Sequence, residues 1–429
     1  MQRFVRSVLL VSICAVLIAA CTSSSSSQQG ASSSGSQAPA PKDAIHISLI
    51  VADLSILTQQ HLAPDIGDPG KVANAVAADI NAHGGVAGKQ LAVTVRPIPN
   101  TAVATDATMQ QVCVQATEED QPFAVVITAA VPVSVVQCSA VGHNELTVTM
   151  DAWQQAVYND AKGRLFAVGT SGSANIERQY GYAPTLLQTQ HALDGKTVGI
   201  LNQDQPADRA AAATALKAAL AKVGIPLAAE ATVPVSSLSS CSQTDAAIQR
   251  MQQAKVNFVF LLAENLCGSS LVNAASRVSY KPQWATLGNN VSNTVAQFYS
   301  PSKDTYDGAW GVGGTGSGQD SNEAKTCNDI VARRTGIHYQ PGTDAYGFTS
   351  LTCLQIQTLA NAMNAAGQPL TQDSVIKALE SQSSVPMNSG PPGSLSETKH
   401  DAGDYLWLAK YSAAKGTFEL VDPTPHKIP

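Results

Sequence analysis

The sequence predicts an α/β fold built as two Rossmann-like lobes with parallel sheets. Short apolar runs alternate with amphipathic segments of helical period along residues 44–425. The strand-like runs are apolar throughout, as in strands that helices cover on both faces. The alternation also passes through two cycles, the second beginning at Thr197. A chain of this length exceeds one typical domain, so we expect two lobes.

The stretch Pro69–Asn100 shows the repeating unit most clearly. Aliphatic residues at three- and four-residue spacing predict a helix that Asp68 caps. Gly84 and Gly85 end this helix, because glycine adopts positive φ without a steric penalty. A strand-like run follows, and another at residues 44–51 precedes. The order strand, helix, strand predicts one right-handed βαβ unit.

The remaining elements follow the same alternation. We expect strands at residues 123–128, 146–150, 165–169, 197–205, 227–235, 257–263, 405–409 and 417–421. We expect helices at residues 106–119, 134–142, 176–193, 207–223, 244–254, 269–278, 323–334, 346–366 and 374–381. Beyond Tyr306 the pattern loosens into a glycine-rich segment, which we interpret as a connection between the lobes.

Residues 75–91 read AVAADINAHGGVAGKQL. This run resembles the opening of type I periplasmic binding proteins, specifically the branched-chain amino acid (Leu/Ile/Val) ABC transporter substrate-binding lipoproteins. The residues that carry the likeness are Ala78, Ile80, Asn81, Gly84, Gly85, Val86, Gly88, Lys89 and Leu91. The order of the predicted elements extends the resemblance over most of residues 44–425.

The resemblance implies that three chain segments join the two lobes and act as a hinge. It places residues 44–165 and 306–395 in the first lobe. Residues 166–305 and 396–425 then form the second lobe, which a final pair of strands completes.

The N-terminus has the layout of an export signal. Two arginines precede an apolar run that is too short for a stable membrane span, and residues 17–21 match a bacterial lipobox. We expect residues 1–20 to be a lipoprotein signal peptide and Cys21 to be lipidated; a plain secretory signal with an incidental cysteine is the alternative. The Ser-rich residues 21–43 are expected to form a disordered tether.

The cysteines favour disulfides. Removal of Cys14 with the signal and lipidation of Cys21 leave an even number, which in an exported chain indicates a disulfide framework. Sequence alone does not fix the connectivity, but the nearly equal spacings favour pairing consecutive cysteines. The expected pairs are Cys113–Cys138, Cys241–Cys267 and Cys327–Cys353.

Several classes of function are excluded. The formal net charge of −6 and the absence of a basic cluster argue against nucleic acid as a partner. No C-x-x-C or histidine pair at ligand spacing supports a metal site, and no catalytic motif or cofactor site is present. Gly311-x-Gly313-x-x-Gly316 satisfies the dinucleotide fingerprint, but it lacks a convincing strand before it, so we interpret it as a flexible crossover loop. We therefore expect a protein that is not an enzyme.

Polar residues follow the predicted strands in both lobes, where open α/β sheets bind ligands. The candidate ligand-binding residues are Asp53, Ser55, Thr128, Ala129, Asp151, Trp153, Gln205, Glu264 and Asn289. Trp153 offers an aromatic platform with an N–H donor. In the resembled family, serine, threonine and glycine of the first lobe and a tyrosine and an acidic residue of the second hold an amino acid. This chain departs from that set, and an acidic Asp151 favours a cation or a hydroxyl-rich ligand over a free carboxylate.

Together these features predict a monomeric, lipid-anchored solute-binding protein on the extracytoplasmic face of the cell membrane. It would capture a small polar, amino acid-like or related molecule by hinge closure and deliver it to an ABC permease. The alternative is an extracytoplasmic sensing domain that signals to a membrane partner without transport.

Overall fold

A computed structural model describes residues 43–59, 63–99, 104–128, 131–204, 208–237, 240–263, 265–288, 291–313 and 320–429. The predicted signal peptide, the predicted lipidation site Cys21 and nearly all of the predicted tether lie outside these residues.

The first sheet is parallel, with strand order β2-β1-β3-β4-β5. Its strands are β1 Ile45–Ala52, β2 Leu91–Ile98, β3 Ala124–Thr128, β4 Thr147–Thr149 and β5 Leu165–Ala167. The three inner strands are almost fully buried because helices cover both faces. This confirms the predicted parallel α/β architecture of the first lobe.

Helix α2 (Pro69–Ala82) shows why this lobe could be predicted locally. The Asp68 side chain accepts a hydrogen bond of 2.9 Å from the Lys71 N–H, and Pro69 occupies the first helical position. At the other end Gly85 has φ +74°, and a Cβ there would lie 2.0 Å from the carbonyl oxygen of Lys89. Only glycine fits this turn, so the chain reverses into β2.

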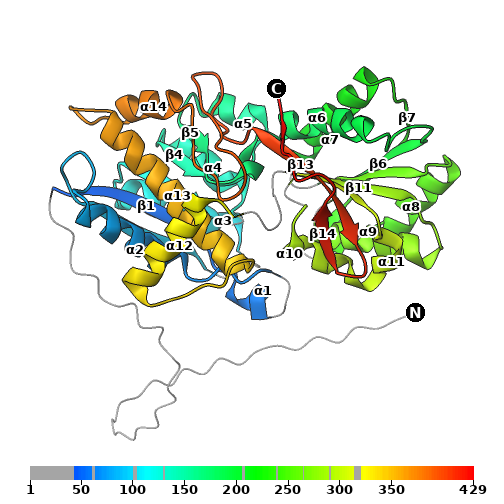
Figure 1. Cartoon of the computed structure of the whole chain (residues 1–429), viewed down its shortest axis with the longest axis horizontal. Helices are drawn as coiled ribbons and strands as arrows, with labels where there is room; N and C mark the ends of the chain where they lie inside the picture. Colours follow the sequence, from blue (N-terminus) through cyan, green and yellow to red (C-terminus); the bar gives the residue numbers. More distant parts are fainter. Residues whose placement is uncertain are drawn as a thin grey trace, which may run out of the picture. The chain divides into compact units, whose positions relative to one another are not determined.

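The helices of the first lobe form two layers, one on each face of the sheet. Helices α3 (Asp106–Val114), α4 (Val133–Gln137) and α5 (Gln155–Asp160) pack on one face. On the other face lie α2 and three helices from late in the chain, α12 (Asn322–Thr335), α13 (Asp344–Ala365) and α14 (Gln372–Glu380). Figure 1 shows α12 and α13 beside β1, so the late helices return to the first sheet as expected.

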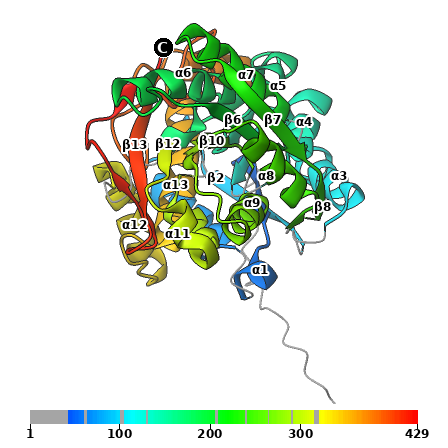
Figure 2. The ribbon, with the colours of Figure 1, turned by 90° about the vertical axis from the view of Figure 1, so that its right-hand side faces the viewer.

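The second sheet has the order β14-β13-β12-β11-β10-β6-β7, and β13 runs antiparallel to both of its neighbours, β12 and β14. Figure 2 shows β13, β12, β10, β6 and β7 of this sheet. Its strands are β6 Val198–Gln203, β7 Leu227–Val233, β10 Phe258–Leu261, β11 Gln283–Leu287, β12 Trp310–Gly313, β13 Tyr405–Ser412 and β14 Thr417–Leu420. A short strand β15 (His426–Lys427) pairs with β13, and a small hairpin joins β8 (Val235–Ser237) to β9 (Ser240–Cys241).

Helices again cover both faces of this sheet. Helices α6 (Ile176–Thr189) and α7 (Asp208–Lys222) pack on one face with the buried aliphatic residues of β6. On the other face lie α8 (Thr244–Gln253), α9 (Asn265–Arg277), α10 (Asn293–Ala296) and α11 (Lys303–Tyr306). The second lobe is therefore also a three-layer α/β unit.

Strand β12 corrects two predictions. Residues 306–313 were expected in the first lobe, with the glycine motif as a flexible loop, but β12 pairs with β11 and β13 in the second sheet. The glycines are required by packing: a Cβ on Gly311 would lie 2.8 Å from Val291, and one on Gly313 would lie 2.5 Å from the carbonyl oxygen of Gly288. The crossover back to the first lobe therefore begins after β12.

Three chain segments lie side by side where the chain passes between the sheets. Gly169 bridges Met387, and the Gly169 carbonyl accepts a 2.8 Å hydrogen bond from the Asn388 N–H. Asp320 bridges Ser389. The first crossing begins after β5, which pairs with β4 along its full length, so the predicted boundary at 165/166 falls within a strand of the first sheet.

The structure contains the three disulfides that the cysteine spacing favours. Cys113–Cys138 ties α3 to the residue that directly follows α4, and Cys327–Cys353 ties α12 to α13, with Cα–Cα distances of 6.4 and 5.8 Å. Cys241–Cys267, at 5.1 Å, ties β9 to the first turn of α9. Each disulfide links neighbouring elements within one lobe.

Candidate functional site

The predicted site residues of the first lobe share one edge of its sheet. Val51 of β1 pairs with Thr128 of β3, and Ile127 pairs with Thr149 of β4, so the carboxyl ends of these strands are aligned. Asp53 directly follows the first of these strands. The structure therefore places Asp53, Ser55, Thr128, Asp151 and Trp153 at the ends of adjacent strands, where parallel sheets bind ligands.

Thr128 supports this edge from inside the lobe. Its side chain is fully buried, with the hydroxyl 3.2 Å from the hydroxyl of Thr352 on α13. One turn further along α13, the Gln355 side-chain amide donates a 2.9 Å hydrogen bond to the Ile127 carbonyl. Neither α13 residue was predicted from the sequence, because nothing local marks a polar residue in a helix as a partner of a strand end far away in the chain.

Asp53 and Ser55 form a local cap. The Asp53 carboxylate accepts a 3.1 Å hydrogen bond from the Ser55 N–H, at the start of α1 (Ser55–Gln59). Ser55 is exposed and Asp53 is half-buried. The Asp53 carboxylate therefore already serves the start of α1, while Ser55 is accessible to solvent.

Trp153 is more deeply buried than an aromatic platform at a site surface would be. Only 7% of it is exposed, and its ring belongs to an apolar cluster with Val131 and Val157. Its indole Nε1 makes no hydrogen bond to any residue that the structure describes. A buried donor without a partner is costly, so this N–H needs an acceptor, which an ordered water or a ligand can supply.

Polar groups also lie close to the apolar cluster that holds Trp153. The Asp151 N–H donates a 3.2 Å hydrogen bond to the Thr149 hydroxyl, and Asp151 is half-buried. Tyr158 lies in the same apolar cluster, and burial raises the pKa of its hydroxyl well above the usual value, so the hydroxyl stays protonated. Around Trp153 the edge therefore combines a carboxylate with neutral donors.

The second lobe places different polar groups at its sheet edge. Arg209, in the first turn of α7, is 8% exposed and donates a 3.0 Å hydrogen bond to the Tyr180 hydroxyl. Its carbonyl accepts from the Asn202 side chain at 3.1 Å. The Asp204 carboxylate accepts from the Val235 N–H at 2.8 Å and so supports the β8–β9 hairpin. Neither Arg209 nor Tyr180 was predicted from the sequence, because Arg209 lies six residues after the end of β6, within helix α7, and Tyr180 lies inside α6.

Four of the predicted residues cannot be located in this way. Ala129, Gln205, Glu264 and Asn289 lie outside the described residues. Their assignment to the site stays a prediction.

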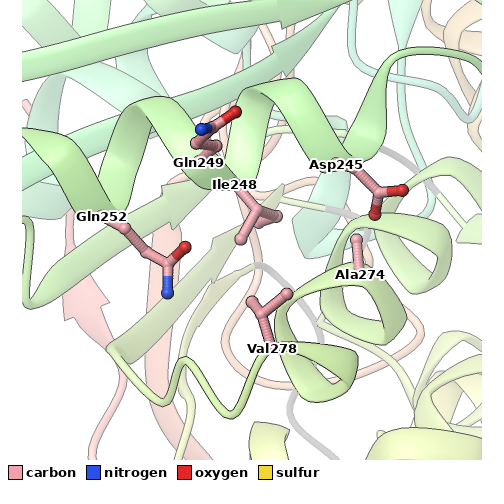
Figure 3. Close-up of a pocket in the computed structure, with 6 residues that line it drawn as sticks. All are labelled: Asp245, Ile248, Gln249, Gln252, Ala274 and Val278. Carbon is pink, nitrogen blue, oxygen red and sulfur yellow. The ribbon is translucent and has the colours of Figure 1, made fainter.

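A separate surface pocket of about 280 Å³ lies between α8 and α9 (Figure 3). Its lining residues are Asp245, Ile248, Gln249, Gln252, Ala274 and Val278. None of the predicted site residues lines it, and its Asp245 carboxylate pairs with Arg277. We therefore do not assign the ligand site to this pocket.

Metal binding finds no support in the described parts of the chain. The one group at ligand distances there is Cys113, Cys138 and His143. The two cysteines are joined in a disulfide, so neither can bind zinc as a thiolate.

As for membrane insertion, no helix within the described ranges combines the length and apolar character that a membrane span needs.

Comparison with known proteins identifies the family of this chain. The profile of the periplasmic binding protein family matches residues 65–417. A search of curated protein sequences finds no match.

Solved structures resemble this fold at low sequence identity. An ABC transporter solute binding protein from R. palustris in complex with 4-hydroxybenzoate superposes with a TM-score of 0.66 at 12% identity, covering 90% of this chain and 98% of that one. A second, from Rhodopseudomonas palustris BisB5 with 3,4-dihydroxybenzoic acid, gives 0.63 at 15% identity, covering 90% and 97%. The branched-chain amino acid transporter substrate binding protein LivJ from Streptococcus pneumoniae, with isoleucine, gives 0.63 at 15% identity, covering 90% and 100%.

Proposed function

Since the chain belongs to the periplasmic binding protein family, a family of binding proteins and not of enzymes, we propose that it is a lipid-anchored solute-binding protein of an ABC importer. In this proposal it captures a small polar molecule between its lobes and delivers it to a permease. The expected lipid on Cys21 and the tether after it would keep the domain close to the membrane that holds the permease.

The observation that carries this proposal is the buried, unpartnered indole N–H of Trp153 at the carboxyl edge of the first sheet. Its neighbours at the edge are a half-buried carboxylate, Asp151, and the cap formed by Asp53. A few convergent polar groups against apolar surface are typical of small-molecule sites.

The arrangement favours a ligand with an apolar body, an acceptor for the Trp153 N–H and a donor for the Asp151 carboxylate. Amino acids and hydroxybenzoates, which solved structures of similar fold contain, both meet this description. We propose a ligand of this kind, amino acid-like or related.

Delivery requires that the protein distinguishes the loaded from the empty state. The three segments that cross between the sheets provide a place to bend. A ligand that contacts both lobes binds the closed state more tightly and so increases its population. A permease that recognises the closed form then receives loaded protein only.

A thermal-shift screen of the mature domain tests the proposal, with amino acids, hydroxybenzoates, polyamines and sugars as probes. A probe at one hundred times its Kd should stabilise the protein by about 2.7 kcal/mol, which gives a clear shift. No shift with any class would contradict solute binding and favour a sensing role.

Trp153→Phe then tests the site itself. It keeps most of the ring packing but removes the N–H, and we expect the affinity for the best probe to fall about tenfold, or about 1.4 kcal/mol. Trp310→Phe is a matched control, because Trp310 is 6% exposed and begins β12 of the second sheet. Equal affinities in the two variants would remove Trp153 from the site.

A further inference from the structure

The segment Asp151–Gln154, called here the α5 loop, connects β4 to α5 and carries Asp151 and Trp153. Helix α5 begins with Gln155 and has no side-chain cap of its own, because the Gln154 side chain makes no capping hydrogen bond. Unsatisfied N–H groups at a helix start need an acceptor from elsewhere. The position of the α5 loop therefore depends on where that acceptor is held.

The acceptor comes from the other lobe. Both carboxylate oxygens of Glu177, on α6, lie 3.0 and 3.1 Å from the Gln155 backbone nitrogen. A carboxylate at the start of a helix is also stabilised by the helix dipole. Glu177 thus caps α5 across the junction between the lobes.

Two further contacts join the same segments. The Trp153 carbonyl accepts a 3.2 Å hydrogen bond from the Ile176 N–H. The Asn175 side-chain amide donates to the Gln155 side-chain oxygen at 2.9 Å. The backbone of Trp153 and the first turn of α5 are therefore held by three consecutive residues of α6 and its cap.

The backbone of Asn175, Ile176 and Glu177 is held in place by buried contacts. The Asn175 N–H donates a 2.8 Å hydrogen bond to the buried Asp401 carboxylate, which also pairs with Arg178. Asn175 is 1% exposed. Because the backbone that carries Glu177 is already fixed, capping α5 costs only the freedom of the Glu177 side chain itself.

We propose that Glu177 is a positioning residue for ligand binding: from the second lobe, it holds the α5 loop of the first lobe in the conformation that presents Trp153 and Asp151. The role in ligand binding rests on the proposed function, whereas the contact between Glu177 and Gln155 does not. The contact between Glu177 and Gln155 also places the α5 loop next to the first crossing segment. The conformation of the α5 loop is therefore physically connected to the hinge.

Amide hydrogen exchange of the ligand-free mature protein tests the contact without knowledge of the ligand. In Glu177→Ala the amides of residues 155–160 should exchange about fivefold faster, the effect expected from loss of one helix cap. Glu177→Gln keeps an acceptor oxygen and should restore most of the protection. Unchanged exchange in Glu177→Ala would overturn the proposal.

Glu323→Ala is the matched control. Glu323 occupies the second position of α12, as Glu177 does in α6, and both helices have 14 residues. Glu323 is exposed, so its replacement removes the same favourable charge from its own helix without removing a contact to α5. Exchange of residues 155–160 should match the wild type in this variant, and an equal increase in both variants would show a general effect of charge and contradict the proposal.

Titration with isoleucine and 4-hydroxybenzoate addresses the ligand. For a probe that binds the wild type, Glu177→Ala should weaken affinity about fivefold while Glu323→Ala does not. If neither probe nor any compound of the screen binds the wild type, the proposed function fails while hydrogen exchange still decides the role of Glu177. If Trp153→Phe weakens binding and Glu177→Ala does not, the proposed site stands and the positioning role is wrong.

Discussion

Two sets of contacts hold the start of α6, and they differ in burial. Arg178 pairs with Asp401 and Asp404, whose side chains are 6% and 7% exposed, and its Nη1 also donates to the Gly403 carbonyl at 3.1 Å. Glu177, the adjacent residue, is partly exposed and contacts the Gln155 N–H of the other lobe. Neighbouring charged residues on one helix therefore have different roles. The buried contacts of Arg178 fix the position of α6, and the accessible Glu177 holds the α5 loop.

The difference shows how burial decides what a charged contact does. A guanidinium between buried carboxylates cannot be removed without leaving Asp401 in a poorly solvated place without its ion-pair partner, while Asp404 keeps Lys399 at 3.0 Å. A partly exposed carboxylate can leave its partner to water at a small cost. We therefore expect changes in the buried set to reduce stability, and changes at Glu177 to alter mainly the α5 loop.

The largest effect is expected for Arg178→Ala. It leaves Asp401 and Asp404 buried without their guanidinium, which should lower the free energy of unfolding by about 3–5 kcal/mol. Denaturant unfolding measures this directly. Arg277→Ala is the control, since Arg277 is 57% exposed and its pair with Asp245 should contribute at most about 1 kcal/mol. Similar losses in both variants would contradict the distinction by burial.

The disulfides should have the next largest effect, and it should remain within each lobe. Replacing Cys327 and Cys353 by serine should lower the free energy of unfolding by about 2–4 kcal/mol, because the unfolded chain gains freedom. Hydrogen exchange of residues 155–160 should not change, since this disulfide ties α12 to α13. Faster exchange at α5 would show that the contact between the lobes depends on the covalent framework.

The two buried carboxylates, Asp401 and Asp404, should affect the pH dependence of stability in opposite ways. Burial alone would raise the pKa of Asp404, but hydrogen bonds from Ser394 and Lys399 outweigh it, so the pKa of Asp404 is lowered. Burial raises the pKa of Asp401 in spite of Arg178. A carboxyl whose pKa is lowered in the folded state stabilises the fold above its unfolded pKa of about 3.9, and this contribution is lost as the pH falls through the folded pKa. A carboxyl whose pKa is raised in the folded state instead destabilises the fold at neutral pH, and this cost disappears as the pH falls.

Asp404→Asn should therefore be less stable than the wild type at pH 7 and should lose less stability on acidification below about pH 4. Unfolding midpoints at a series of pH values between neutral and acidic provide the test. Parallel curves for the two proteins would show that Asp404 does not contribute in this way.

Much of the fold could be predicted, because many of its determinants are local. The cap at Asp68 and the turn at Gly85 lie within a few residues of α2, and the aliphatic runs of β1 and β3 are continuous. Strand β12 was missed because its glycines are selected by close contacts with Val291 and Gly288. A strand without side chains on one face shows no apolar pattern to read.

The candidate site could be predicted less well. The rule that ligands bind at the ends of parallel strands selected Asp53, Thr128, Asp151 and Trp153, and these residues do lie at one edge of the sheet. That they bind a ligand stays a prediction. It could not reveal that Thr128 contacts Thr352, or that the Trp153 ring packs into the core. These contacts depend on which helix of a distant segment covers each strand end, and no local pattern specifies this.

The most direct test of the central claim is small-angle X-ray scattering of the mature domain, with and without the compound that gives the largest thermal shift. If the lobes close on a ligand, the radius of gyration should fall at saturation, and the fall should be smaller for Trp153→Phe at the same ligand concentration. A bound ligand that leaves the radius of gyration of the wild type unchanged would contradict capture by hinge closure.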